Sequence, residues 1–448
     1  MRNAVPLGTV GSIDTTDLFG AIDLAARSRL VVAVSGGGDS LALLFLLKQY
    51  LDSQGLDTRP LAVTVDHRLR PEAADEAGQV EAIARSIGIE HRTLAWEAAK
   101  PGSGISAAAR EARHALLARA AREAGADIVL TGHTIEDQAE TVAMRQQRGP
   151  GRGAAGIAPA TLFEGRCWFV RPLLRTRRAA LRRYLSAVGR DWIDDPSNED
   201  RRHERVRLRA ALSADDVAAL AARAAEAGAL REALGQRAAS LIDRMASMPA
   251  PGLLRLDPAF TSCRDEEAAA YALRILLAAA GGTEQLPDAE RTWVLLDRMR
   301  EGAARANLSR TVVDGRKAGI FLHRESRGLP RPRPFAPGPW DGRFRLEGSA
   351  PDATVAPATG DGDEGPEPVP ASLVRAAHAA RPALYHGGRL ARLLDREGPA
   401  GARAVPVVAP WARYLPCFDL APARSLAALL GAAEIPPSPL PEHNRRKA

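Results

Sequence analysis

The sequence predicts an α/β fold, in which an N-terminal parallel sheet carries helices on both faces and is followed by a mostly helical domain and a small C-terminal module. Two observations favour the parallel sheet. Short apolar runs rich in β-branched residues alternate with longer helical patterns up to about residue 130, which is typical of parallel sheets covered by helices. Polar residues also gather where the expected strands end, the edge at which such sheets bind ligands.

Each element follows from the local sequence. The expected strands, short and apolar between turn residues, cover residues 30–34, 60–67, 89–96 and 126–133. A long apolar helix follows the first strand. The second helix starts at Pro71, because proline suits a first helical turn, and the third runs from Ser106 to a closing glycine, Gly125.

The stretch SGGGDS, residues 35–40, joins the first strand to the first helix. Gly36, Gly37 and Gly38 can adopt positive φ and let backbone N–H groups approach a ligand, and the helix that follows turns its unpaired N–H groups to the same point. This predicts an anion site. A carboxylate beside bound phosphate is repelled unless a cation lies between them, so Asp39 predicts Mg²⁺. A tight turn with polar helix caps remains the alternative.

Two common nucleotide motifs are missing from this loop. No Lys-Ser/Thr pair ends it, as a Walker A loop requires, and the spacing G-x-G-x-x-G of a dinucleotide fold is absent. The loop therefore favours neither a common NTPase nor a dehydrogenase.

A second polar cluster follows the fourth expected strand. If Thr134 caps a helix there, Asp137 and Glu140 lie one turn apart on a face near His133. Together with Asp39 these carboxylates would repel one another without a cation, which favours a metal site. The alternative is that the acids complement the helix dipole and form a capping box with no chemistry attached.

The charge of the chain favours a polyanionic partner. Over 448 residues, 61 Lys and Arg stand against 54 Asp and Glu, for a net charge of +7 and a pI near 9.7. The densest cationic stretch, Arg166 to Arg209, holds 13 arginines and 6 acids. Because arginine pairs bidentately with phosphate, this stretch predicts a nucleic-acid contact, with a solvated charged helix as the alternative.

The cysteines and the apolar segments indicate a cellular setting. Cys167, Cys263 and Cys417 are too scattered for a disulfide framework or a zinc site, which fits a reducing compartment. No apolar segment reaches membrane-spanning length and no signal peptide is recognisable. A soluble, cytoplasmic protein with no membrane partner is expected.

Composition divides the chain into three expected domains: residues 1–212, 213–330 and 331–448. The second is mostly helical and ends in a hairpin around Asp314-Gly315. In the third, residues 348–370 are rich in Pro, Gly and acids, which predicts a flexible insertion.

Several motifs, taken in order, resemble the PP-loop ATP pyrophosphatases and, among them, the tRNA(Ile)-lysidine synthetases. The resemblance covers about residues 30–212, through SGGGDS, VDHRLRPEAADEAGQV, AAAREARHALL, GHTIEDQAET, RGPGRGAAGIAP, RPLLRTRRAAL and WIDDPSNEDRRHERVRLRAAL. SGGGDS alone marks only the superfamily, whereas the ordered series is specific. Two positions depart from the family pattern: Glu136 stands where an aspartate is usual, and His203 stands where Tyr or Phe is common.

The resemblance implies ATP-dependent ligation of L-lysine to C2 of the wobble cytidine in the isoleucine tRNA with a CAU anticodon. The cytosine O2 first attacks the α-phosphate of ATP and pyrophosphate leaves; the lysine ε-amine then displaces AMP. The helical domain would contact the tRNA. Mg²⁺ would assist, with Asp39 and Asp137 as its expected ligands, and a homodimer stays open.

Site residues follow from the same resemblance. The expected catalytic residues are Asp39, Arg113, Asp137 and Glu140. ATP is expected to contact Ser35, Gly36, Gly37, Gly38, Asp39, Ser40, Val65, His67 and His133. The tRNA is expected to contact Arg175, Arg201, Arg202 and Arg205. For Arg113, a surface arginine paired with nearby glutamates is the alternative.

Rival functions remain. A tRNA thiolase would use paired cysteines, and no C-x-x-C occurs; an amide synthetase of the same superfamily would act on a small acid. A nucleotide-dependent RNA-binding protein without turnover would need no cluster of acids facing phosphate, so Asp39, Asp137 and Glu140 disfavour it. Pyrophosphate release that requires both tRNA and lysine would distinguish these functions.

Overall fold

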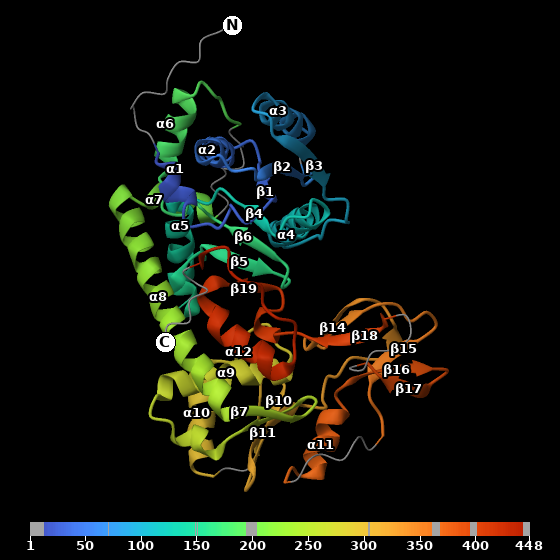
Figure 1. Ribbon diagram of the computed structural model, residues 1–448. Coiled ribbons are helices and arrows are strands. Elements are labelled where there is room, and N and C mark those ends of the chain that lie inside the picture. Colours follow the sequence, from blue (N-terminus) through green and yellow to red (C-terminus); the bar gives the residue numbers. More distant parts are fainter. Residues whose placement is uncertain are drawn as a thin grey trace. The chain divides into compact units, whose positions relative to one another are not determined.

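The computed structural model (Figure 1) describes residues 13–69, 71–147, 149, 151–193, 204–302, 305–360, 368–394 and 401–441. The chain forms two compact units. The first draws on Met1–Arg231, Pro416–Phe418 and Pro436–Ala448, and the second on Glu232–Leu415 and Asp419–Ile435. Residue 212, the predicted end of the first domain, falls between two helices of the first unit.

The first unit contains the predicted parallel sheet. Its strands are β1 (Arg29–Ala33), β2 (Arg59–Asp66), β3 (Glu90–Ala95), β4 (Ile128–Leu130), β5 (Ala160–Phe163) and β6 (Cys167–Val170). They lie in the order β5-β6-β4-β1-β2-β3. All neighbours are parallel except β5, which runs antiparallel to β6. The four predicted strands are confirmed as β1 to β4.

Helices cover both faces of this sheet, as predicted. The helices in this part of the chain are α1 (Thr15–Phe19), α2 (Gly38–Gln54), α3 (Ala73–Ser86), α4 (Ile105–Glu123), α5 (Ile135–Gln146), η1 (Arg152–Ala155), α6 (Arg178–Ala187), α7 (Glu204–Ala211) and α8 (Ala214–Met245), of which α8 continues into the second unit. Helices α2 and α3 lie on one face and α4 on the other (Figure 1). Leu30, Val31 and Val32 of β1 are fully buried between the two layers, which explains why the strand is a continuous apolar run.

The strand order fixes the place of the site. Strand β1 pairs with β2 on one side and β4 on the other, so the chain reverses its direction across the sheet between β1 and β4. Ligands bind outside the carboxyl ends of strands at such a switch point. One predicted polar cluster follows β1, and the other follows β4.

The second unit contains a five-stranded antiparallel sheet within the region predicted as mostly helical. Its elements are β7 (Ala246–Ala250), β8 (Leu253–Leu256), η3 (Pro258–Ser262), α9 (Glu266–Gly281), α10 (Ala289–Arg300), β9 (Arg305–Leu308), β10 (Thr311–Arg316) and β11 (Gly319–Arg324). The strands lie in the order β7-β8-β11-β10-β9.

The predicted hairpin is present as β10 and β11, but its turn was placed wrongly. Arg316 pairs with Gly319, so the turn is Lys317-Ala318, and Asp314 pairs with Phe321 inside the ladder. Gly319 has φ +141°, and a Cβ there would lie 2.9 Å from the carbonyl oxygen of Leu256. The chain therefore turns where a residue without a side chain is required.

The remaining elements include the strands of two small sheets and two α-helices. They are β12 (Arg333–Pro334), β13 (Gly338–Trp340), β14 (Phe344–Glu347), β15 (Thr354–Pro357), α11 (Ala371–His378), β16 (Pro382–His386), β17 (Arg389–Leu393), β18 (Arg403–Pro406), η5 (Ala409–Trp411), β19 (Tyr414–Pro416), η6 (Cys417–Asp419) and α12 (Leu420–Leu430). The sheets have the orders β12-β15-β16-β17 and β13-β14-β18.

The prediction of a flexible insertion at residues 348–370 is partly wrong. Strand β15 lies inside residues 348–370 and pairs with both β12 and β16. Val355 is fully buried in a core that includes Trp340 and Leu384, so burial of a short apolar segment outweighs the acidic, glycine-rich composition around it. Residues 361–367 lie outside the described residues. Among the helices that the structure describes, none has the length and apolar character needed to span a membrane.

Candidate active site

A cavity of about 510 Å³ lies at the switch point of the first sheet. Residues that follow β1 and β4 line it, together with residues of α4, α6 and α7. The predicted site residues among them are Ser35, Gly37, Gly38, Asp39, Ser40, Arg113, His133, Asp137 and Arg205. The sequence analysis did not assign a role to the others: Gly132, Arg178, Arg182, Ile193 and Arg209.

The glycine loop is shaped by close packing against a distant segment. Gly36 has φ +81°, and a Cβ there would lie 2.6 Å from Cδ1 of Ile193. The N–H of Ile193 donates to the carbonyl oxygen of Gly36 (3.0 Å), and the Trp192 ring lies 3.4 Å from where a Cβ of Gly38 would be. Glycine is therefore needed in this turn because the side chains of Ile193 and Trp192 pack directly against its backbone at the start of α2.

Two further contacts fix this loop. The Ser40 hydroxyl donates to the carbonyl oxygen of Gly37 (2.9 Å) and accepts the N–H of Ser35 (3.1 Å). A Cβ on Gly132 would lie 3.0 Å from the carbonyl oxygen of Asp39, so the loop after β4 packs directly on the start of α2. These contacts bring the two predicted clusters into one site.

Arg178 connects the two predicted metal ligands. Its Nε lies 2.9 Å from Oδ2 of Asp39, and its Nη2 lies 3.5 Å from Oδ1 of Asp137. Burial raises the pKa of Asp39 above its ordinary value; Arg178 opposes this shift, while the carboxylate of Asp137 adds to it. The two acids therefore lie close enough to share one cation.

Asp137 is the acid that the site holds ionised. Burial opposes its ionisation, but His133, Arg178, Arg205 and the N–H of Thr134 together outweigh burial and lower the pKa of Asp137. That N–H donates to Oδ2 of Asp137 at 2.8 Å, which confirms Thr134 as the N-cap of α5. Burial, followed by the cation Arg171, holds the pKa of His133 well below its ordinary value, while the carboxylate of Asp137 opposes this shift.

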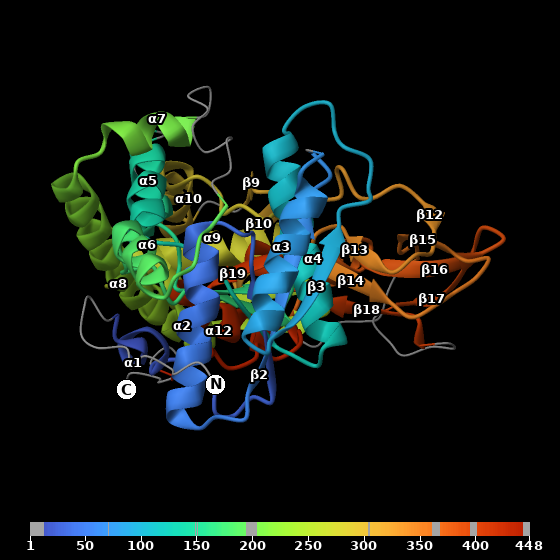
Figure 2. The ribbon, with the colours of Figure 1, turned by 90° about the horizontal axis from the view of Figure 1, so that it is seen from above.

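Glu140 is buried beneath two arginines of α7. Its side chain is 2% exposed, and its carboxylate oxygens lie 2.7 Å from Nε of Arg205 and 2.8 Å from Nε of Arg209. Figure 2 shows α7 beside α5, the helix that carries Glu140. Arg205 also reaches Asp137 at 3.4 Å. The basic stretch therefore contributes directly to the acid cluster.

Removing both of these arginines is expected to destabilise the fold. The double variant Arg205→Met/Arg209→Met leaves the buried Glu140 carboxylate without its two hydrogen-bonded cations, and we expect the free energy of unfolding to fall by about 3–5 kcal/mol. Urea denaturation followed by circular dichroism measures this. Arg207→Met, exposed on the same helix, is the matched control. A double variant as stable as the wild type would mean that the pairs contribute nothing.

Arg113 lines the cavity as an uncompensated cation. It is half-buried on α4 and, within the described residues, it makes no hydrogen bond or ion pair. Burial and the neighbouring cation Arg110 lower the pKa of its guanidinium. The alternative of a surface arginine paired with glutamates does not describe this side chain, which is suited to a bound anion.

Some predicted residues lie elsewhere. Val65 and His67 are at the carboxyl end of β2 and do not line the cavity; the His67 ring packs edge-on against Trp96 at 6.0 Å. Arg175 is exposed before α6. Arg201 and Arg202, and also His203, lie outside the described residues.

Glu136 has a different environment from Asp137. Its Oε2 accepts the N–H of Arg178, the first residue of α6, at 3.0 Å, and it does not line the cavity. The carboxylate thus caps a neighbouring helix. Apart from Gly132, which begins the loop after β4, the lining residues without a predicted role belong to the arginine-rich stretch; its charge was noted, but its individual contacts were not predictable.

The fold and the cavity define an ATP-using enzyme of the PP-loop class, and a family described as the PP-loop domain matches residues 13–215. The tRNA(Ile)-lysidine synthase of Mesorhizobium japonicum is 47% identical over 96% of this chain and 98% of its own. That of Rhizobium meliloti is 39% identical over 73% of this chain and 75% of its own. The chain belongs to the tRNA(Ile)-lysidine synthase family.

Similarity to solved structures is lower. The U34-tRNA thiolase NcsA from Methanococcus maripaludis matches with a TM-score of 0.41 and 15% identity, over 47% of this chain and 76% of its own. A similarity of this extent does not assign an activity.

Proposed function

We propose that this protein ligates L-lysine to C2 of the wobble cytidine of the isoleucine tRNA with a CAU anticodon, using ATP and releasing AMP and pyrophosphate. One observation carries the proposal: Asp39 and Asp137 converge on Arg178 in a cavity that also contains the glycine loop and the uncompensated Arg113. Family membership supports the choice of substrates.

The ATP phosphates bind at the glycine loop and the start of α2. Gly37 is the N-cap of α2, so the first N–H groups of this helix lack partners within it and suit an anion. Arg113 and Arg178 add positive charge from α4 and α6. They stabilise the α-phosphate as the cytosine O2 attacks it and the bond to the bridging oxygen breaks, with the electron pair leaving on pyrophosphate.

Mg²⁺ fits the oxygen donors of the site. It is commonly held by one or two carboxylates together with substrate phosphates and water, and Asp39 and Asp137 supply two carboxylates around one point. Within the part of the chain that the structure describes, no group of three or more His, Cys, Asp and Glu could hold a metal. Bound Mg²⁺ would neutralise charge that develops on the leaving pyrophosphate.

In the second step the lysine ε-amine attacks C2, and the bond between C2 and the oxygen carrying AMP breaks. The amine must lose a proton to a carboxylate nearby. Glu140 is already hydrogen-bonded by Arg205 and Arg209, so we assign it a positioning role. The proton then passes to Asp39 or Asp137.

The test is to incubate the protein with isotopically labelled lysine, ATP and total tRNA and to analyse the tRNA nucleosides by mass spectrometry. We expect one cytidine to gain the label, and pyrophosphate release to require both lysine and tRNA. Pyrophosphate release without tRNA would indicate an amide synthetase acting on a small acid. Nucleotide-dependent tRNA binding without pyrophosphate release would indicate a non-catalytic RNA-binding protein.

Reversing charge at Arg201 and Arg202 is expected to weaken tRNA binding. Each lost phosphate contact lowers the slope of log affinity against log salt by about one, which filter binding over a salt series measures. The control reverses charge at Arg389, exposed in β17. Arg205 is left out of this test because its contacts with Asp137 and Glu140 make it part of the acid cluster. An unchanged slope would mean that these arginines are merely solvated.

A cytoplasmic location follows from the proposed tRNA substrate. Cys167, Cys263 and Cys417 are not joined by disulfides, which is compatible with a reducing compartment.

A further inference from the structure

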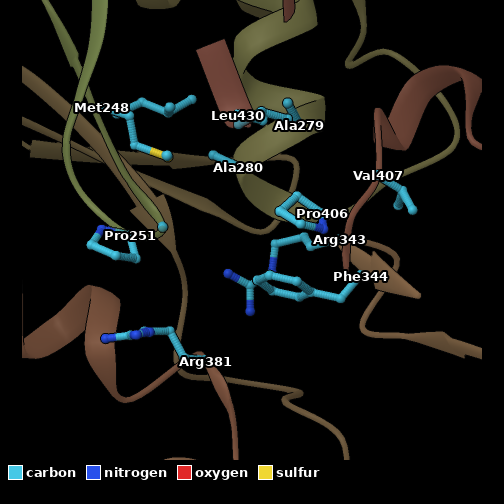
Figure 3. A pocket seen from close by; sticks show the side chains of 12 residues that line it. Met248, Pro251, Ala279, Ala280, Arg343, Phe344, Arg381, Pro406, Val407 and Leu430 are labelled. Atoms are coloured by element: carbon cyan, nitrogen blue, oxygen red, sulfur yellow. The ribbon is translucent and has the colours of Figure 1, made fainter. Parts of the chain in front are cut away.

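A second cavity, of about 90 Å³, lies wholly within the second unit and shares no residue with the candidate active site (Figure 3). Its wall is mainly apolar and includes Met248, Leu254, Phe344, Val407 and Leu430. These residues come from two sheets and from the end of α12. The proposed reaction gives this cavity no role.

Arg343 brings a buried positive charge to the cavity. Its side chain is 7% exposed, and Figure 3 shows its guanidinium pointing into the open space. Nε is 2.8 Å from Asp341, and Nη2 donates to the carbonyl oxygen of Ala380. Nη1 makes no hydrogen bond to any residue that the structure describes. It lies 3.9 Å from the position that a Cβ of Gly252 would occupy. Gly252 also lines the cavity.

Among the described residues, one carboxylate serves Arg343 and two further arginines. Arg310, Arg324 and Arg343 all pair with the single carboxylate of Asp341. Asp341 and Arg324 are completely buried. Burial, with the cations Arg324 and Arg310, lowers the pKa of Arg343 to about 10 in spite of Asp341, so the group is charged at neutral pH. Excess buried charge is costly unless an anion offsets it.

We propose that this cavity binds a small organic carboxylate, with its carboxylate on Nη1 of Arg343 and an apolar body against the surrounding side chains. An engineered cavity of about 150 Å³ holds benzene, so a volume of about 90 Å³ suits a branched body of about four carbon atoms. None of the described residues that line the cavity is an acid, which disfavours a ligand that also carries an ammonium group. Inorganic phosphate would lose its hydration against an apolar wall.

Isothermal titration calorimetry of the full chain with isovalerate tests the proposal. We expect saturable binding that weakens at least about tenfold for isovaleramide, the uncharged analogue, because a charged hydrogen bond is lost. Arg343→Met should weaken isovalerate binding by about the same factor. Ala280→Leu, which fills the cavity and keeps every charge, should abolish it. Arg389→Met, an exposed arginine of the same unit, should bind like the wild type.

Arg343→Met leaves Asp341 paired with Arg310 and Arg324, so we expect it to fold; if it does not, Ala280→Leu decides. Four results would each overturn the proposal: no saturable binding of isovalerate, equal binding of isovaleramide, unchanged binding by folded Ala280→Leu, or binding of inorganic phosphate as strong as that of isovalerate. The proposed carboxylate site does not depend on the proposed ligase reaction, because calorimetry measures ligand binding without enzyme turnover.

Discussion

Replacing Asp39 by asparagine is expected to abolish pyrophosphate release while leaving the protein folded and no less stable. Asparagine keeps the volume of the side chain but removes the charge that faces Arg178, Asp137 and the ATP phosphates. Loss of one such electrostatic contact costs about 10²–10³-fold in rate, and loss of a metal ligand adds to this. Pyrophosphate formation with tRNA and lysine present measures the effect.

The stability of this variant follows from the pKa of Asp39, which is raised in the folded protein, chiefly by burial. An acid whose pKa is raised on folding makes the folded state less stable as pH rises through that pKa. Asparagine cannot ionise, so at neutral pH the variant should melt at the same temperature as the wild type or higher. Asp52→Asn on the same helix, where Asp52 is exposed and pairs with Lys48, should leave the rate unchanged. Normal turnover by Asp39→Asn would refute the assignment of Asp39.

Asp137→Asn is expected to be both inactive and less stable. His133, Arg178, Arg205 and the N–H of Thr134 together outweigh burial and lower the pKa of Asp137. An acid of this kind stabilises the fold above its unfolded pKa of about 3.9, and the contribution is lost as pH falls through the lower folded pKa. We expect a loss of about 1–3 kcal/mol at pH 7. The difference in unfolding free energy between wild type and variant should shrink when urea titrations are repeated below about pH 4.

Glu136→Gln is the matched control for Asp137→Asn. Glu136 caps α6 by accepting the N–H of Arg178, and glutamine keeps an acceptor oxygen there. We expect most activity to remain and stability to fall by about 0.3–1 kcal/mol through the lost charge at a helix N-terminus. If Glu136→Gln is inactive and Asp137→Asn active, the wrong carboxylate has been placed at the metal, because the two side chains leave α5 about 100° apart.

The sequence was informative where local patterns decide the structure. Strands β1 to β4 are short apolar runs between turns, and Thr134 with Asp137 has the spacing of a capping box, so both the sheet edge and the register of α5 were predictable. The meeting of Asp39 with Asp137 also followed, since parallel strands place their carboxyl ends together.

Contacts between distant segments were not predictable. Arg178 stands 139 residues after Asp39, and nothing in a run of arginines distinguishes it from the exposed Arg175. The pairing of Arg205 and Arg209 with Glu140 depends on the packing of α7 against α5, which no local period encodes. Strand β15 shows the same limit, because its pairing partners β12 and β16 outweigh its composition.

Trp192 and Ile193 cover the glycine loop, and this limits how the proposed nucleotide site can be grafted onto another protein. The strands and helices through β4 do not suffice to hold the glycine loop in its conformation. The backbone of Gly36 accepts a hydrogen bond from Ile193, which lies much later in the chain. A chimera that takes only the first 190 residues would leave the turn without the side chain that fills its concave side. The smallest portable module therefore runs through Ile193, and a graft that also keeps the acid cluster neutralised must extend through α7 to Ala211.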